Sequence, residues 1–154
     1  MRALLLASVV LVALAALGVA STAAATRVAR GGGEFASGEA FAFFAQKRDQ
    51  TTSGWAWFFM ANTSPYPVEG RVRCLLVKGD KAAMTGTLTV PVTMPGSDAI
   101  MRTFSLVVED LGSGGTAPTD AAGLSFGDGA TASPCSSAIG NSGFAMEAGD
   151  VTVR

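Results

Sequence analysis

The chain beyond residue 38 alternates apolar and polar residues in short runs that glycine and proline interrupt. In segment 68–78, apolar residues face one way and charged residues the other: Val68, Val72, Cys74 and Leu76 against Glu69, Arg71 and Arg73. Segment 81–92 alternates in the same manner: Ala82, Met84, Leu88 and Val90 against Thr85, Thr87 and Thr89. A period of two residues is typical of a strand with one buried face, so both segments are predicted to be strands.

Further strands are predicted along the rest of the chain: Glu39–Gln46, Gly54–Ala61, Ile100–Asp110 with Phe104, Leu106 and Val108 inward, a short one at Leu124–Phe126, and one or two within Gly143–Arg154. Gly79 and Asp80 are predicted to form a hairpin turn, because glycine adopts positive φ without strain. No segment after the N-terminal apolar run keeps the period of a helix. The pattern predicts an all-β fold, an antiparallel β-sandwich or flattened barrel of about seven or eight strands.

The N-terminal residues have the features of a targeting segment that is removed before folding. Arg2 precedes an unbroken apolar run over residues 3–20, and residues 23–25 are alanines that suit a cleavage site. We expect a cleaved signal peptide over residues 1–25 and a secreted, extracellular or cell-envelope location. The alternative is an uncleaved membrane anchor, because the run approaches the length that spans a bilayer. Residues 26–38 are predicted to be a flexible glycine-rich linker, which leaves 39–154 as a single all-β domain.

The charge balance argues against nucleic acid as a partner. The chain has 11 basic and 12 acidic residues, and removal of Arg2 with the signal peptide makes the remainder more acidic. Such a balance creates no electrostatic attraction toward nucleic acid or anionic membranes. We therefore expect no nucleic-acid partner and no membrane association after signal cleavage, and leave other partners open.

The chain contains no histidine, which excludes several classes of enzyme. Ser-His-Asp and Cys-His nucleophile systems need an imidazole base, and most zinc sites need histidine or four cysteines. A carboxylate-dependent hydrolase stays open as an alternative, although no pair of acidic residues is marked by a motif. We therefore expect a protein that is not an enzyme and that uses no cofactor.

Cys74 and Cys135 are predicted to form a disulfide, because exported chains meet oxidising conditions. The bridge would close a loop of about 60 residues, which the chain-entropy model values at roughly 4 kcal/mol. The alternative is a pair of buried free thiols.

The sequences FAFFAQ and GWAWFFMA predict an aromatic hairpin around the polar stretch 47–53. Pairing of Gln46 with Gly54 would place five aromatic residues on one face: Phe41, Phe43, Trp55, Trp57 and Phe59. The other face would carry smaller and larger apolar residues: Ala40, Ala42, Phe44, Ala56, Phe58 and Met60. Because soluble monomers do not expose two such faces, we expect the five-aromatic face to be core.

Two other interpretations of the hairpin stay open. Trp55, Trp57 and Phe43 could line a pocket for a small apolar ligand or a glycan. Alternatively, the second apolar face could meet a partner chain. An open cavity at these three residues would favour binding, and a filled core would favour a structural role.

Two polar patterns suggest ion sites, each with a plainer alternative. Asp110 and Asp120 flank a glycine-rich loop and are the candidate ligands for Ca²⁺, although their spacing does not match an EF-hand. A turn in which aspartate satisfies local backbone groups explains them equally well, so no metal is expected. Arg71 and Arg73 share one strand face, which is either solvated or a small anion site.

Several short motifs together resemble a known family. They are a Gly-x-Val-x-Cys strand, a Val-x-Asp-x-Gly loop and a final strand that opens with Gly-Asp: Gly70, Val72 and Cys74, then Val108, Asp110 and Gly112, then Gly149, Asp150 and Val153. In this the chain resembles small exported actinobacterial proteins related to the post-COAP domain, over residues 41–154. It departs from that pattern in Trp55 and Trp57, and in aspartate at positions 80 and 150. The resemblance implies a β-rich exported domain and transfers no catalytic residue.

These observations together predict an exported, non-enzymatic β-rich module with a structural or binding role at or outside the cell surface. The alternative is an extracellular binding protein that holds a small apolar ligand or glycan on the aromatic hairpin 41–59.

Overall fold

The computed structural model describes residues 25–60, 67–90, 100–112, 120–129 and 131–154. These residues form one antiparallel sheet in the order β8-β7-β6-β5-β4-β3-β2-β1-β9. The elements are β1 (Arg27–Glu34), β2 (Ala40–Arg48), β3 (Thr51–Phe59), β4 (Val68–Lys78), β5 (Lys81–Val90), β6 (Ile100–Glu109), β7 (Ala121–Asp128), α1 (Cys135–Ala138), β8 (Phe144–Ala145) and β9 (Ala148–Val153). The predicted antiparallel all-β class is confirmed, with nine strands in the described part of the chain. The predicted signal peptide, apart from Ala25, lies outside these residues, as does the side chain of Val90.

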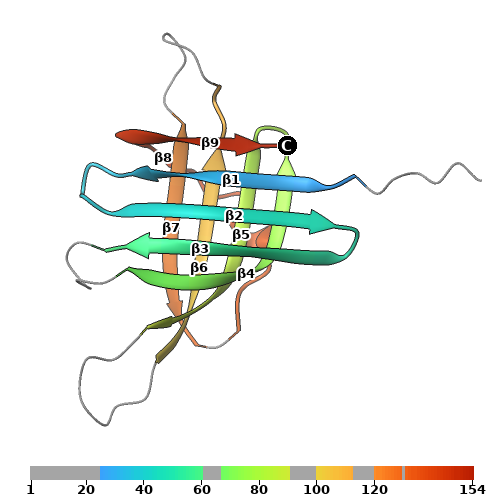
Figure 1. Cartoon of the computed structure of the whole chain (residues 1–154), viewed down its shortest axis with the longest axis horizontal. Coiled ribbons are helices and arrows are strands. Elements are labelled where there is room, and N and C mark those ends of the chain that lie inside the picture. The colour runs from blue at the N-terminus through green and yellow to red at the C-terminus, as the bar shows by residue number, and fades with distance from the viewer. Residues whose placement is uncertain (1–24, 61–66, 91–99, 113–119, 130) are drawn as a thin grey trace, which may run out of the picture.

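The sheet curls so that its two halves pack against each other (Figure 1). Strands β9, β1, β2 and β3 lie side by side in front, and β5, β6 and β7 cross behind them. Strand β4 belongs to both halves, because it starts beside β3 and then turns to run beside β5. The β4–β5 pairing shifts between Val72 and Cys74, and a bulge of this kind bends the strand that carries it. The bulge is therefore the corner of the curled sheet.

The hydrophobic core fills the space between the two halves. Phe58 of the front half and Phe104 of the back half meet at its centre, with ring centroids 5.0 Å apart. A Cβ atom on Gly70 would come within 2.9 Å of the Phe104 ring, so glycine at this position gives the ring its space. The predicted inward residues of 81–92 and 100–110 that the structure describes are all buried: Ala82, Met84, Leu88, Phe104, Leu106 and Val108.

Residues 26–38, predicted to be a flexible linker, instead contribute strand β1 to the middle of the front layer. The linker prediction was wrong because it took three consecutive glycines, 31–33, as a sign of flexibility. In the fold they pair with both β2 and β9. A Cβ on Gly32 would come within 2.6 Å of the Phe41 carbonyl oxygen, so the close approach of the strands requires glycine.

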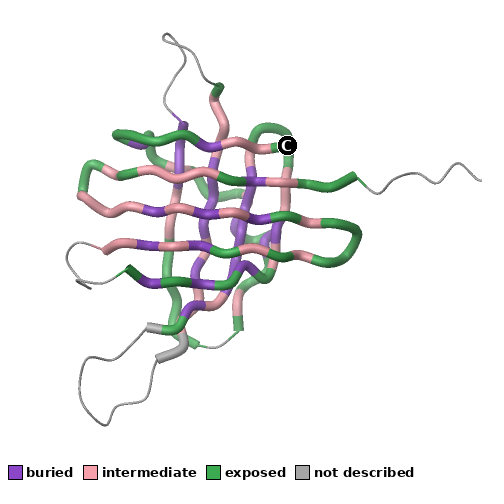
Figure 2. Tube along the Cα trace, viewed as in Figure 1, coloured by how far each residue is buried: buried purple, intermediate pink, exposed green. Residues whose placement is uncertain are grey.

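The aromatic hairpin differs from its predicted register by one residue. Strand β2 continues to Arg48, which pairs with Thr51 across a two-residue turn, instead of ending at Gln46. Asp49 takes a positive φ of 54° in this turn, which aspartate tolerates better than most residues. A shift of one residue in one strand moves all its side chains to the other face. Figure 2 shows the resulting alternation of buried and less buried positions along β2 and β3.

The predicted five-aromatic core face is therefore wrong for three of its members. Phe41 and Phe43 do face the core, but they do so with Ala56 and Phe58 of β3. The remaining aromatic residues lie on the outer face: Phe44, Trp55, Trp57 and Phe59.

The bulge in β4 also changes the predicted alternation of 68–78. Val72 is buried and Arg73 is exposed, as predicted. Cys74 should then face the core, but Leu75 is the next residue of the strand that is buried there. Cys74 and Leu76, predicted to face the core, instead belong to a second apolar cluster on the outer side of the sheet. Helix α1 covers this cluster with Cys135 and Ala138. The stretch between the strands predicted at Leu124–Phe126 and within Gly143–Arg154 thus contains a helical turn.

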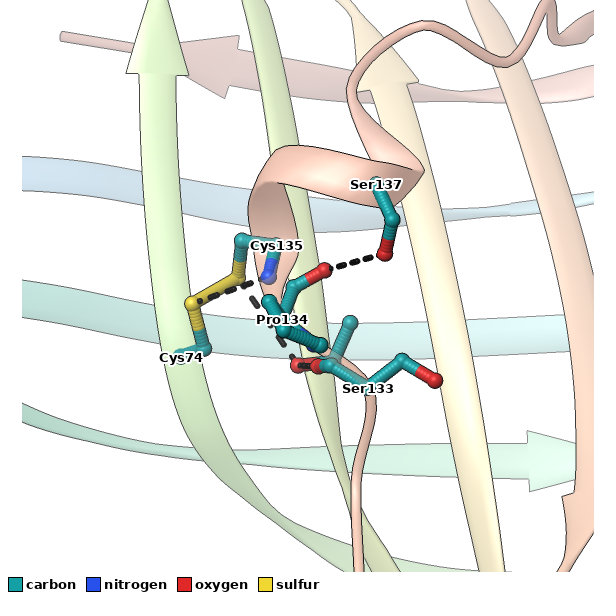
Figure 3. The surroundings of a disulfide bond; sticks show 6 residues. Cys74, Ser133, Pro134, Cys135 and Ser137 are labelled. Atoms are coloured by element: carbon teal, nitrogen blue, oxygen red, sulfur yellow. Dashed lines mark hydrogen bonds between the residues drawn. A yellow bond between two sulfur atoms is a disulfide. The ribbon is translucent and has the colours of Figure 1, made fainter.

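Cys74 and Cys135 form a disulfide that attaches α1 to the outer surface of β4, with Cα atoms 5.9 Å apart (Figure 3). The buried hydroxyl of Thr85 on β5 donates a hydrogen bond of 2.6 Å to the Ser133 carbonyl, just before the helix. Strand β7 is longer than the predicted Leu124–Phe126. Its pairing with β6 extends over eight residues. Among the described residues, no helix has the length and hydropathy needed to cross a bilayer.

We expect reduction of the disulfide to lower the free energy of unfolding by about 2–4 kcal/mol, because the bridge restricts a long loop in the unfolded chain. Chemical denaturation with and without reductant measures the change. A Cys74→Ala/Cys135→Ala double variant is the control and should show no response to reductant. Equal stability of the oxidised and fully reduced protein would contradict the prediction.

Candidate functional site

A groove of about 800 Å³ lies on the outer face of the sheet, where β3, β4 and β5 run side by side. We call it the outer groove and define it by its lining residues: Ala42, Trp55, Ala56, Trp57, Glu69, Gly70, Arg71, Arg73, Thr87 and Thr89. Its chemistry changes from strand to strand, with indole rings on β3, charged groups on β4 and hydroxyl groups on β5. An apolar wall with a few polar groups beside it is typical of a ligand site.

The aromatic wall follows directly from the register of the β2–β3 hairpin. Trp55 and Trp57 are two residues apart on β3, so both side chains point to the outer face. The Trp55 residue is 51% exposed, which is unusual for so large an apolar side chain. The chain has two tryptophans, and both of them line this groove.

The charged floor is formed by β4. Trp55 lies directly opposite Arg71, and Trp57 directly opposite Glu69. Arg73 lies two residues after Arg71 and therefore shares its outer face, and the bulge interrupts the alternation only at Cys74. All three charged side chains are exposed.

No ion pair joins these charged groups within the described part of the chain, where the salt bridges are Lys81–Glu109 and Arg102–Asp128. The Arg71 and Arg73 guanidinium groups also form no hydrogen bond to another described residue. Exposed charges of this kind are solvated in the free protein and available to a ligand. This exposure fits both predicted alternatives for Arg71 and Arg73, a solvated strand face and a small anion site.

The hydroxyl side of the groove comes from β5. Thr87 pairs with Arg71 across the β4–β5 ladder and therefore continues the row that begins at Trp55. The alternation in the sequence places the threonines of this strand on its polar face but does not connect them with the tryptophans. The hairpin turn at Gly79 and Asp80 sets the pairing of β4 with β5, and it could have indicated which threonine lies beside which arginine. The bulge, however, shifts this pairing by one residue.

The three residues of the predicted aromatic pocket do not all come together. Trp55 and Trp57 line the outer groove, whereas Phe43 is 2% exposed and lies in the core on the opposite side of the sheet. The Phe43 ring stacks on Phe41, with centroids 6.1 Å apart. The one-residue difference in register is the cause, because it places Phe44 instead of Phe43 on the face of the tryptophans.

The carboxylates of Asp110 and Asp120, the candidate calcium ligands, bind backbone N–H groups. Asp120 is buried and accepts hydrogen bonds of 2.8 Å from the N–H groups of Leu111 and Val151. Asp110 accepts one of 3.1 Å from the N–H group of Val153. The two aspartates thereby satisfy the free edge of β9, which agrees with the backbone-satisfying alternative. In the described residues, no cluster of three or more potential metal-ligating side chains was found.

A second, more apolar cleft of about 490 Å³ lies between the β1–β2 turn and the β7–β8 edge. Phe35, Met60 and Leu124 line it and also pack against the core. Phe144 lines it as well and is 76% exposed. This cleft contains no described basic residue, so its chemistry differs from that of the outer groove.

A scan of protein-family models, a search of curated proteins and a search of solved structures each found no match to this chain. The resemblance to the post-COAP domain therefore stays a prediction, and the outer groove is the feature from which function is inferred.

Proposed function

We propose that this chain is an exported, non-catalytic β-module that binds a glycan in the outer groove. The observation that carries the proposal is the pair Trp55 and Trp57, which face outward side by side from one strand. The apolar C–H faces of a sugar ring stack on an indole, and its hydroxyl groups need polar partners nearby. The outer groove supplies both, because Glu69 lies opposite Trp57 and Thr87 lines the same groove one strand further on.

The spacing of the tryptophans supports an oligosaccharide over a single small molecule. Side chains two residues apart on a strand are separated by roughly 6.5–7 Å. Two indole rings at this separation can stack on two rings of one sugar chain. An open groove, rather than an enclosed cavity, also suits a ligand that extends beyond the site.

Binding is favoured over hydrolysis by the charges of the groove. Glycoside hydrolases use two carboxyl groups, one on each side of the scissile bond. The described lining of the outer groove contains one carboxylate, that of Glu69. The predicted hydrolase alternative therefore has less support in this groove than a binding role.

Export is proposed on the N-terminal apolar segment and on the disulfide. Bonds such as Cys74–Cys135 persist in oxidising compartments and are rare in the cytosol. A glycan ligand at or outside the cell surface is consistent with that location.

Tryptophan fluorescence tests the proposed function directly, because both tryptophans of the chain line the groove. We expect titration with a binding oligosaccharide to shift or quench the emission of the folded protein. Trp55→Ala should weaken binding at least about tenfold by calorimetry, since stacking aromatics dominate such interfaces. The variant should remain folded, because Trp55 is largely exposed.

The matched control is Phe144→Ala, which removes an exposed aromatic side chain from the second cleft. It should bind each glycan as the unmodified protein does. Equal loss of binding in both variants, or no response to any neutral or acidic oligosaccharide, would contradict the proposed function.

A further inference from the structure

A neutral sugar that stacks on the tryptophans would not need the two arginines of the outer groove. Arg71 and Arg73 present two guanidinium groups on the outer face, and Glu69 offers one carboxylate. The groove thus carries a local excess of positive charge in a chain whose formal net charge is −1. Neither guanidinium has an acidic partner in the described part of the chain, where the ion pairs involve other residues.

Regular alternation along β4 puts both guanidinium groups on the outer face, because Arg71 and Arg73 are two residues apart. In an uninterrupted strand, Cys74 would then face the core. The bulge instead turns Cys74 outward, where it bonds with Cys135. The disulfide therefore attaches α1 to the outer side of β4, one residue beyond Arg73.

Resting on the proposed glycan-binding function, we infer that the ligand is an acidic glycan, whose uronic acid carboxylate lies against Arg71 and Arg73. A guanidinium group matches a carboxylate through two parallel hydrogen bonds. Neighbouring strands are about 4.8 Å apart, so a ring stacked on Trp55 places its exocyclic carboxylate over Arg71 on the next strand. Sugar hydroxyl groups then reach Glu69 on one side and Thr87 on the other.

Single-stranded nucleic acid, which also combines stacking bases with negative charge, fits the groove less well. Its affinity comes mainly from neutralising many phosphates along a basic channel. The outer groove offers two arginines and an opposing glutamate, and the chain as a whole has more acidic than basic residues.

The test compares the acid and the methyl-ester forms of an oligosaccharide, which have the same sugar rings and linkages. Tetragalacturonate and tetramannuronate are titrated into the full exported protein beside their fully methyl-esterified forms, which keep the ring and lose the charge. We expect the acid form of at least one to bind about tenfold more tightly than its ester, from charge-assisted hydrogen bonds. The preference should decrease at high ionic strength, because these side chains are exposed.

Variants separate a specific role of the arginines from a structural one. R71Q/R73Q should reduce the preference for acid over ester to less than about twofold, because it should weaken binding of the acid form much more than binding of the ester. R71K should keep part of the preference, since lysine retains the charge but not the fork geometry. R102Q is the matched control, because Arg102 is paired with Asp128 outside the groove, and it should change nothing.

Each remaining outcome contradicts a defined part of the inference. Equal affinity for acid and ester, or binding to neutral cellotetraose alone, would overturn the acidic ligand and leave glycan binding intact. Equal loss of acid and ester binding in R71Q/R73Q would overturn the assigned role of the arginines. Failure of every saccharide to bind would overturn the proposed function itself, and tighter binding of a ten-residue thymidine oligonucleotide would assign the groove to nucleic acid.

Discussion

Phe58→Ala is expected to lower the free energy of unfolding by about 3–5 kcal/mol. Phe58 is fully buried, and its ring contacts both Phe104, with centroids 5.0 Å apart, and Phe126, with centroids 5.4 Å apart. Removing the ring leaves a cavity between the two halves of the sheet. The surrounding strands cannot close this cavity, because the register on both sides is set by ladders of backbone hydrogen bonds. Equilibrium denaturation in urea measures the loss.

The neighbouring residue provides the control for this prediction. Phe59 lies on the outer face of β3 and is half-buried, so Phe59→Ala should cost clearly less than Phe58→Ala. The register predicted from sequence reverses this order, because it places Phe59 in the core and Phe58 outside. A larger loss for Phe59→Ala would therefore contradict the observed register. The observed register also places Trp57 on the outer face and not in the core. Trp57→Ala is therefore expected to affect binding more than stability.

Asp120→Ala is expected to destabilise the protein by about 3–5 kcal/mol, because it removes the acceptor of two hydrogen bonds near the β9 edge. The N–H groups of Leu111 and Val151 both donate to the Asp120 carboxylate, which is 5% exposed. Without it, the Val151 N–H group has no partner in a buried position. Thermal and urea denaturation measure the effect.

Two variants show whether the hydrogen bonds are the cause. Asp120→Asn keeps one carbonyl oxygen as acceptor and should lose less stability than Asp120→Ala. Asp128→Ala removes an exposed carboxylate that pairs with Arg102, and should change stability by no more than about 1 kcal/mol. Equal stability of Asp120→Ala and Asp128→Ala would show that the Asp120 carboxylate does not stabilise the edge of β9.

The outer groove was only partly predictable from the sequence. The tryptophans and the arginines were each identified as candidates, but the predicted pocket joined Trp55 and Trp57 with Phe43. The register of the β2–β3 hairpin decides which side chains share a face. Lys47, Arg48 and Thr51 look like turn residues in the sequence, yet they belong to the paired strands. The difference of one residue moved the tryptophans from the core to the surface.

The all-β class, the cysteine pair and the inner faces of β5 and β6 could all be predicted from local patterns along the chain. Alternation of apolar and polar residues is a local property, and it is sufficient wherever a strand is regular, as Met84 and Leu106 show. The role of Gly31–Gly33, the position of Cys74 and the outer groove became apparent only in the folded sheet. These features depend on which strand lies beside which and in what register. That is a matter of close approach between distant backbone segments, which no local pattern records.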